Sequence, residues 1–172
     1  DGELVLAESG AILEYLAETY GGQAQGEAAQ LLAATGSAEH RQLRFWMHYA
    51  EGSLMNWLVM KLVFTSIPNQ PMPFFAKPIA RALCAKVQEQ LVDPNVDAAL
   101  AFMEDHLGRH RWFAGEQLSM ADFQMSFAVE AALSRAAKAK DCPKLQAYCE
   151  RMQARPAYQL AIAKGGPVVM AA

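Results

Sequence analysis

The sequence predicts a mainly α protein, and three observations support this fold class. Apolar residues recur at helical spacing through most of the 172 residues. Ser119 and Asp122 have the spacing of a capping box, which marks the start of a helix. Clusters of Gly and Pro separate the periodic segments, as expected between helices. Only a short stretch at the start of the chain has the pattern of a strand.

The first residues predict a strand that is followed by a helix. Asp1-Gly2 is a hairpin-turn signal, and "ELVLA" at residues 3–7 then has the composition of the second hairpin strand. A lone strand leaves its backbone groups unpaired, so we expect a partner strand upstream of Asp1, in a longer protein. Ser9 is predicted to cap a helix that ends at Gly21-Gly22, with apolar residues Ile12, Leu13, Leu16 and Tyr20.

Residues 23–36 are rich in Gly, Ala and Gln, and we interpret them as a linker. Ser37 is predicted to cap a helix that continues to about residue 65. Apolar residues cover much of its circumference, which predicts burial on more than one side. The stretch "SIPNQPMP" at residues 66–73 then ends the helix with three prolines.

A second long helical region is predicted over residues 74–110. Pro94 interrupts it, and "DPNV" is compatible with either a kink or a new helix start. The capping box opens a helix over residues 119–135, and further helices are predicted over 143–154 and 156–164. We therefore divide the chain into part of a first domain at residues 1–22, the linker, and an all-helical domain at residues 37–172.

Composition excludes several classes of function. The net charge is −3, from 15 Lys and Arg against 18 Asp and Glu, and no basic tract stands out, so we expect no nucleic-acid partner. The apolar stretches are interrupted by polar residues, so we expect no membrane span. The three cysteines are scattered, which argues against a disulfide framework and favours a cytoplasmic location.

Neither the cysteines nor the histidines predict a catalytic or metal site. Cys149 lies in a helical pattern that indicates packing. His106 and His110 are four residues apart, which places them on one helix face, but two ligands are too few for a closed metal site. We therefore interpret both as surface histidines and expect no metal.

Four stretches together resemble the cytosolic glutathione transferase family, particularly its bacterial and fungal branches. They are residues 1–20 ("DGELVLAESGAILEYLAETY"), 45–54 ("FWMHYAEGSL"), 112–125 ("WFAGEQLSMADFQM") and 143–158 ("PKLQAYCERMQARPAY"). The resemblance implies the last strand and helix of a thioredoxin-like α/β domain, followed by the family's all-helical carboxy-terminal domain.

The resemblance also implies a ligand for Glu8 and Ser9. In this family a Glu-Ser pair between the last strand and the last helix of the thioredoxin-like domain holds the γ-glutamyl end of glutathione. Independently of the family, a helix N-terminus favours a carboxylate, Ser9 offers a hydroxyl, and Glu8 offers an anion to an ammonium group. By itself, Glu-Ser before a helix is better explained by a plain cap and a solvated charge, and the resemblance is what favours the ligand role.

The implied activity is conjugation of the glutathione thiolate to a hydrophobic electrophile, or glutathione-dependent reduction of a peroxide. In the family the residue that activates the thiol lies upstream of the part that this chain resembles, so we assign no catalytic residue in this chain. Glutathione is the expected co-substrate, and a homodimer is the expected assembly. One helix face is predicted to line the pocket for the hydrophobic substrate, with packing as the alternative for each of Met55, Asn56, Val59 and Leu62. The rival interpretation is a non-catalytic interaction module with the same fold.

Overall fold

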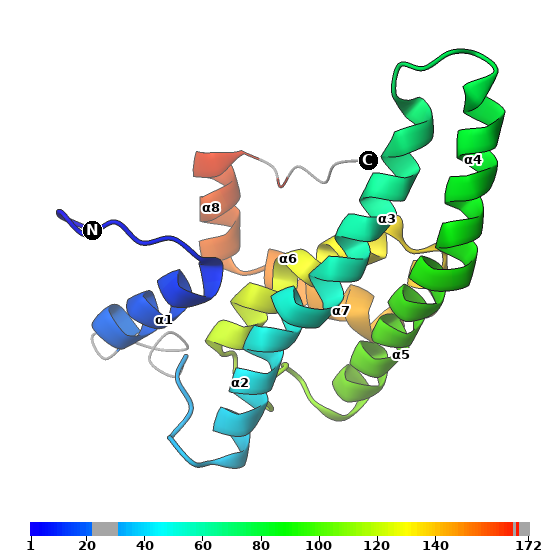
Figure 1. Ribbon diagram of the computed structural model, residues 1–172. Helices are drawn as coiled ribbons and strands as arrows, with labels where there is room; N and C mark the ends of the chain where they lie inside the picture. Colours follow the sequence, from blue (N-terminus) through cyan, green and yellow to red (C-terminus); the bar gives the residue numbers. More distant parts are fainter. Residues whose placement is uncertain (22–30, 167, 169–172) are drawn as a thin grey trace.

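The computed structural model describes residues 1–21, 31–166 and 168, and the described part is built from helices (Figure 1). This confirms the mainly α fold class. The α-helices are α1 (Ser9–Tyr20), α2 (Ala38–Tyr49), α3 (Asn56–Ser66), α4 (Ala76–Val87), α5 (Asp93–Arg109), α6 (Met120–Arg135), α7 (Pro143–Gln153) and α8 (Pro156–Gly165).

The two long predicted helical regions are confirmed, but each contains a π-helical segment. Segment η3 (Ala50–Met55) joins α2 to α3, and η5 (Gln88–Val92) joins α4 to α5. Ser37 caps α2 as predicted, because its hydroxyl accepts a hydrogen bond of 3.0 Å from the backbone N–H of His40. Pro94 lies in the first turn of α5, directly after η5. A proline is tolerated there because the first N–H groups of a helix have no partner within it.

Helix α6 lies at the centre of the fold. It packs against α1, α2, η3, α3 and α7, and its side chains join one continuous core. Burial of this much apolar surface is the main favourable term in folding. The largest fully buried side chains include Trp46, Leu54, Met103, Phe113, Met125, Leu145 and Tyr148.

The predicted capping box at the start of α6 is confirmed, and its acidic member is buried. Asp122 accepts hydrogen bonds of 2.9 Å from the backbone N–H groups of Ser119 and Phe113, and one of 3.0 Å from the Ser119 hydroxyl. The Tyr148 hydroxyl donates to the Asp122 carbonyl at 2.8 Å. These contacts tie the loop before α6 and helix α7 to one helix start.

A second carboxylate holds the start of α7. The Glu104 side chain on α5 accepts hydrogen bonds from the backbone N–H groups of Lys144 and Leu145, at 2.8 and 2.9 Å. An anion at this position satisfies two backbone donors and complements the positive end of the helix dipole. Helices α5, α6 and α7 therefore form a mutually fixed group.

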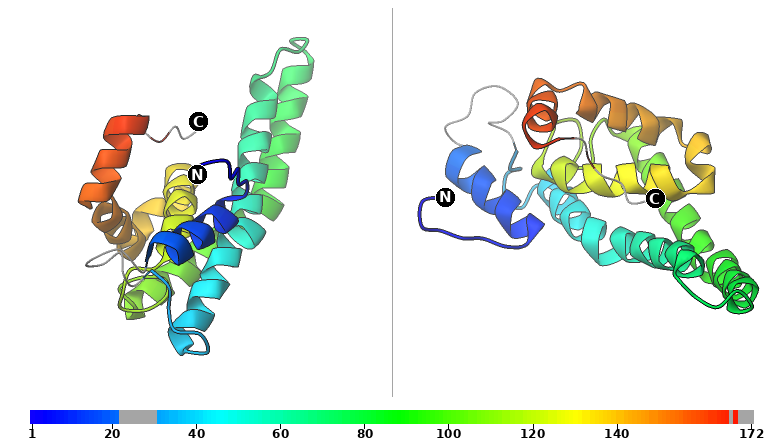
Figure 2. Two further views of the ribbon diagram at one scale, coloured as in Figure 1. Left: turned by 90° about the vertical axis from the view of Figure 1, so that its left-hand side faces the viewer. Right: turned by 90° about the horizontal axis from the view of Figure 1, so that it is seen from above.

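Helices α3 and α4 form an antiparallel hairpin that extends beyond the other helices (Figures 1 and 2). Lys61 on α3 pairs with Asp93 at the start of α5, with 2.5 Å between Nζ and Oδ1. Several large apolar side chains of the hairpin are exposed, and the most exposed are Phe74, Phe75, Ile79 and Leu83.

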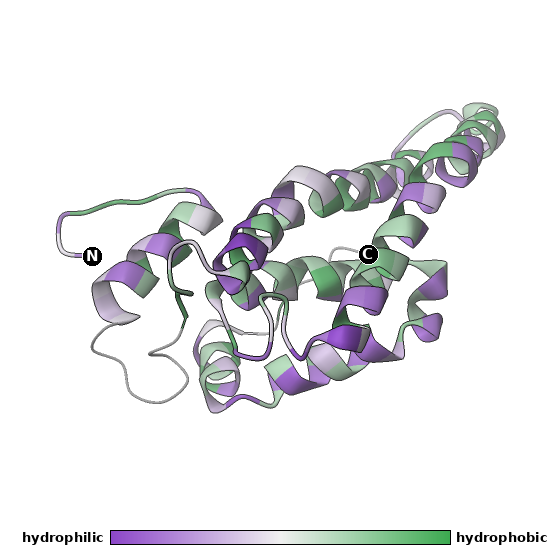
Figure 3. Ribbon diagram, turned by 90° about the horizontal axis from the view of Figure 1, so that it is seen from below, coloured by the Kyte–Doolittle hydropathy of each residue, from purple (hydrophilic) through white to green (hydrophobic). Residues whose placement is uncertain are grey.

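The predicted strand over residues 3–7 is not present. The backbone N–H of Leu4 donates to the carbonyl of Asp1 at 3.0 Å, and Gly2 has a φ of 59°, so the predicted turn forms without strands. The described residues contain no second strand to pair with residues 3–7, and an unpaired strand is unstable. This hydrophobic segment instead runs beside α1 (Figure 3). The Tyr15 hydroxyl donates to the Asp1 side chain at 2.9 Å.

One further prediction is not tested, and one is wrong. Most of the predicted linker at 23–36 falls on residues 22–30, which lie outside the described residues, so the division into two domains stays a prediction. His106 is not a surface histidine: it is buried, its Nε2 lies 3.0 Å from the Phe113 carbonyl oxygen, and it packs against Trp46. Burial lowers the pKa of His106, which favours the neutral ring.

We predict that Asp122 makes stability pH-dependent. Burial raises the pKa of its carboxyl group to about 6, from an ordinary value of 3.8. The folded chain then binds more protons than the unfolded chain between these values, so stability falls as the pH rises through this window. Urea unfolding of the native chain and Asp122→Asn would measure this. The stability of the native chain relative to the variant should fall by roughly 2–3 kcal/mol between about pH 4 and 7. A difference that does not change with pH would contradict this assignment.

Candidate functional site

Glu8 has a strained backbone at the start of α1. Its φ is 72° and its ψ is 119°, and among the described residues it alone combines a positive φ with a side chain. A non-glycine residue in this region costs about 1–3 kcal/mol, and such residues concentrate at functional sites. The strain places an exposed carboxylate directly before the first turn of a helix.

Ser9 is the first residue of α1 and does not cap it, so the capping prediction is wrong. The N-cap position is Glu8, and no side chain makes a capping hydrogen bond there. The Ser9 hydroxyl instead accepts a hydrogen bond of 2.9 Å from Nε2 of Gln124 on α6. The Ser9 hydroxyl therefore bonds to a residue 115 positions away in the sequence and not to the backbone of its own helix.

Gln124 also contacts a third polar residue. Its Nε2 donates to Oε1 of Glu51 at 3.2 Å, so the amide lies between α1 and η3. Glu51 is exposed, whereas Gln124 is only 7% exposed. Glu8, Ser9, Glu51 and Gln124 thus form a polar group where α1 meets α6 and η3, and we call it the α1 polar group. Gln124 was not identified from the sequence as a site residue. The one feature of the sequence that could have indicated it is a polar residue between the apolar Phe123 and Met125.

The residues predicted to line a hydrophobic pocket lie along η3 and α3. Met55 and Leu62 are half-buried, whereas Asn56 and Val59 are exposed. The Asn56 side chain donates to the carbonyl of Gly52 at 2.9 Å, within its own helical segment. The four residues follow one helix, and their role in substrate binding stays a prediction.

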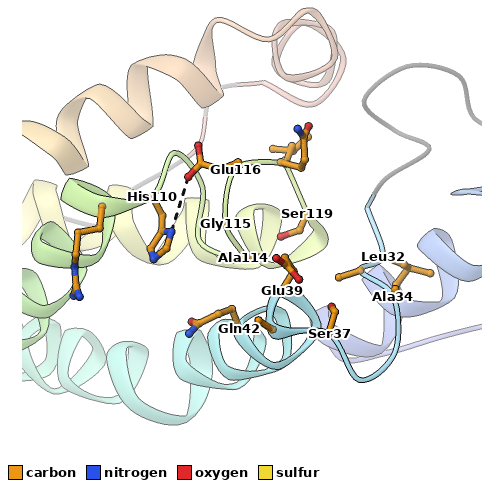
Figure 4. Close-up of a pocket in the computed structure, with 15 residues that line it drawn as sticks. Leu32, Ala34, Ser37, Glu39, Gln42, His110, Ala114, Gly115, Glu116 and Ser119 are labelled. Atoms are coloured by element: carbon orange, nitrogen blue, oxygen red, sulfur yellow. Dashed lines mark ion pairs between the residues drawn. The ribbon is translucent and has the colours of Figure 1, made fainter.

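A pocket of about 820 Å³ lies elsewhere, between the start of α2 and the loop that precedes α6 (Figure 4). Glu39, Gln42 and Ser119 line it, and the Glu116 carboxylate lies 3.9 Å from Nδ1 of His110 at its edge. None of the residues predicted to bind glutathione or the hydrophobic substrate lines this pocket. Its polar side chains include both acidic and basic groups, so it favours no single ligand charge.

The cysteines are poorly suited to nucleophilic chemistry. Cys84, Cys142 and Cys149 are buried and free. Burial raises the pKa of Cys142, and it raises the pKa of Cys149 to about 12, so these thiols stay protonated near neutral pH. Within the described ranges, no three His, Cys, Asp or Glu side chains are grouped to hold a metal ion, and no helix is long and apolar enough to cross a bilayer.

Comparisons with known proteins agree on one family. A family model described as the glutathione S-transferase C-terminal domain matches residues 55–156. The chain is 32% identical over 168 residues to glutathione S-transferase 3 of Zea mays, covering 95% of this chain and 68% of that protein. It is 28% identical over 164 residues to glutathione S-transferase 3 of Schizosaccharomyces pombe, covering 95% of this chain. It spans only 65% of the length of the S. pombe protein.

A solved structure supports the fold. The glutathione S-transferase from Xylella fastidiosa superimposes with a TM-score of 0.72 at 22% identity, covering 98% of this chain and 74% of that one. At this identity the likeness is evidence for the fold alone.

We predict that Glu8→Gly stabilises the fold while removing the carboxylate. Glycine adopts a positive φ without strain but loses more backbone entropy on folding, so the expected net gain is about 1 kcal/mol. Thermal unfolding of Glu8→Gly and Glu8→Gln would measure it, because Glu8→Gln removes the charge and keeps the strain. Equal melting temperatures for both variants would show that the strain at Glu8 is no larger than the entropy cost of glycine, against the expected gain.

Proposed function

Because this chain belongs to the glutathione S-transferase C-terminal domain family, we propose that it is part of an enzyme that transfers glutathione. The enzyme would join the glutathione thiolate to a hydrophobic electrophile, or use glutathione to reduce a peroxide. The observation that carries the proposal is the strained Glu8, which places a carboxylate beside the Ser9 hydroxyl at the start of α1.

We propose that Glu8 and Ser9 hold the γ-glutamyl end of glutathione. This end carries both a carboxylate and an ammonium group. The first N–H groups of α1 have no partner within the helix and lie at its positive end, so they favour the carboxylate, and Ser9 adds a hydroxyl. The exposed Glu8 side chain offers the opposite charge to the ammonium group.

The residue that activates the thiol is not assigned to this chain. Thiolate attack needs a group that lowers the thiol pKa, and the buried cysteines do not supply one. We propose that the activating residue lies in the part of the protein that precedes this chain. The half-buried Met55 and Leu62, with Asn56 and Val59, are our candidates for the wall that contacts the hydrophobic substrate.

We also propose a homodimer and a cytoplasmic location. The exposed Phe74, Phe75, Ile79 and Leu83 on the α3–α4 hairpin form more apolar surface than isolated surface residues usually do. Burial of such a surface against a second copy is favourable. Sedimentation equilibrium on the complete gene product should give a dimer mass, and a monomer at micromolar concentration would contradict this part of the proposal.

Glutathione binding by the complete gene product tests the main proposal. We expect Ser9→Ala to weaken glutathione binding roughly 10- to 100-fold, because a hydrogen bond to a charged group contributes about 1.5–3 kcal/mol. Calorimetric titration would measure the Kd. Ser134→Ala is the matched control, because the Ser134 hydroxyl donates locally, to the Ala131 carbonyl at 2.9 Å, and lies outside the α1 polar group.

Two results would contradict the proposal. Absence of glutathione binding by the complete protein would favour an interaction module with this fold. Conjugating activity from the 172-residue chain alone would show that the thiol-activating residue lies within it, against our assignment.

A further inference from the structure

We infer that Gln124 is a positioning residue of the proposed glutathione site. Held by Glu51, its side-chain amide fixes the Ser9 hydroxyl as a hydrogen-bond donor toward the carboxylate of the ligand. The inference rests on the proposed role of Glu8 and Ser9 and extends it to α6 and η3, two elements of the helical domain.

Gln124 reaches from the core to the surface. Gln124 is only 7% exposed, whereas its two hydrogen-bond partners, Ser9 and Glu51, are exposed. Nε2 donates to Ser9 Oγ at 2.9 Å and to Glu51 Oε1 at 3.2 Å. Since an amide nitrogen carries two hydrogens, both donors are used by these two contacts.

Glu51 determines which way the amide points. A carboxylate only accepts hydrogen bonds, so the amide nitrogen must face it. The opposite orientation would place the Gln124 carbonyl oxygen against a carboxylate oxygen, and two acceptors repel each other. The nitrogen that faces Glu51 also faces Ser9, so the orientation set by Glu51 applies to both contacts.

The orientation of the Gln124 amide determines where the hydrogen of the Ser9 hydroxyl points. A hydroxyl has one hydrogen to donate and two lone pairs that accept. Because Gln124 donates to Ser9, the hydrogen of the Ser9 hydroxyl points away from Gln124. It can then join the free N–H groups of the first turn of α1 in binding a carboxylate. Without Gln124 the hydroxyl would rotate freely, and part of this orientation would be lost.

Glu51, which orients the Gln124 amide, lies in the π-helical segment η3. Segment η3 packs against α6, and one extra residue in a helical turn shifts the side chains that follow it by roughly 100° around the helix axis. Such π turns occur frequently at functional sites. Glu51 remains exposed, so its charge keeps its hydration and costs little free energy.

Gln124→Met tests the inference, because methionine has a similar size and donates no hydrogen bond. The test is calorimetric binding to the complete gene product. Two ligands are compared: glutathione, and an analogue in which hydrogen replaces the γ-glutamyl carboxylate. We expect the variant to bind glutathione roughly 10-fold more weakly than the native protein does and to bind the analogue unchanged. Ser9→Ala should show the same pattern, and the double variant should lose little more.

Gln124→Glu and Gln90→Met provide a second variant and a control. Glutamate at 124 keeps the shape, but the Ser9 hydroxyl would then donate to it, so binding of glutathione should fall relative to binding of the analogue. This variant also serves if Gln124→Met does not fold. Gln90 is exposed on η5 and lies outside the α1 polar group, so Gln90→Met should bind both ligands as the native protein does.

The outcomes separate the two proposals. Equal weakening for both ligands would indicate a general structural effect, and no weakening would indicate no role; either result overturns the inference and leaves the proposed function intact. If the native protein does not bind glutathione more tightly than the analogue, the proposed role of Ser9 fails, and this inference fails with it.

Discussion

Three hydrogen bonds converge on the buried carboxylate of Asp122, and they determine where α6 begins. Two come from backbone N–H groups that burial would otherwise leave unpaired, and one comes from the Ser119 hydroxyl. An unpaired buried donor costs about 1–3 kcal/mol, so the helix has little freedom to start elsewhere. The register of α6 then determines which of its side chains face α1, η3 and α7.

The α1 polar group depends on this register. Gln124 lies two residues after Asp122, and its amide contacts Ser9 and Glu51. A shift of one residue would turn Gln124 by about 100° around the helix and break both contacts. A helix start that stabilises the core thus also positions a polar side chain at the surface. The register of α6 therefore matters both for the stability of the fold and for the proposed binding site.

The sequence was most informative where the deciding contacts are local. Ser37 and the Ser119–Asp122 pair could be predicted because each bonds to backbone within three residues. Ser9 could not, because its partner is 115 residues away. His106 was misjudged for a similar reason: its polar partner is a carbonyl presented by the loop before α6. The strand over residues 3–7 depended on pairing with another strand, which no local pattern supplies.

Glu8 and Ser9 were chosen from a resemblance, and their roles remain proposals. The strain at Glu8 was not predictable, because no residue type signals a positive φ there. Glycine would adopt this backbone more easily, so a carboxylate at this position favours a functional reason over a structural one. The chain belongs to the glutathione S-transferase C-terminal domain family, and we propose no thiol-activating residue within these 172 residues.

The most direct measurement is an NMR titration of the complete protein with glutathione, following backbone amide resonances. Within residues 1–172, we predict that the amides of Ser9, Gly10 and Ala11, at the start of α1, shift most, together with the side-chain amide of Gln124. Shifts confined to the pocket between α2 and the loop before α6, with α1 unchanged, would contradict the proposed site.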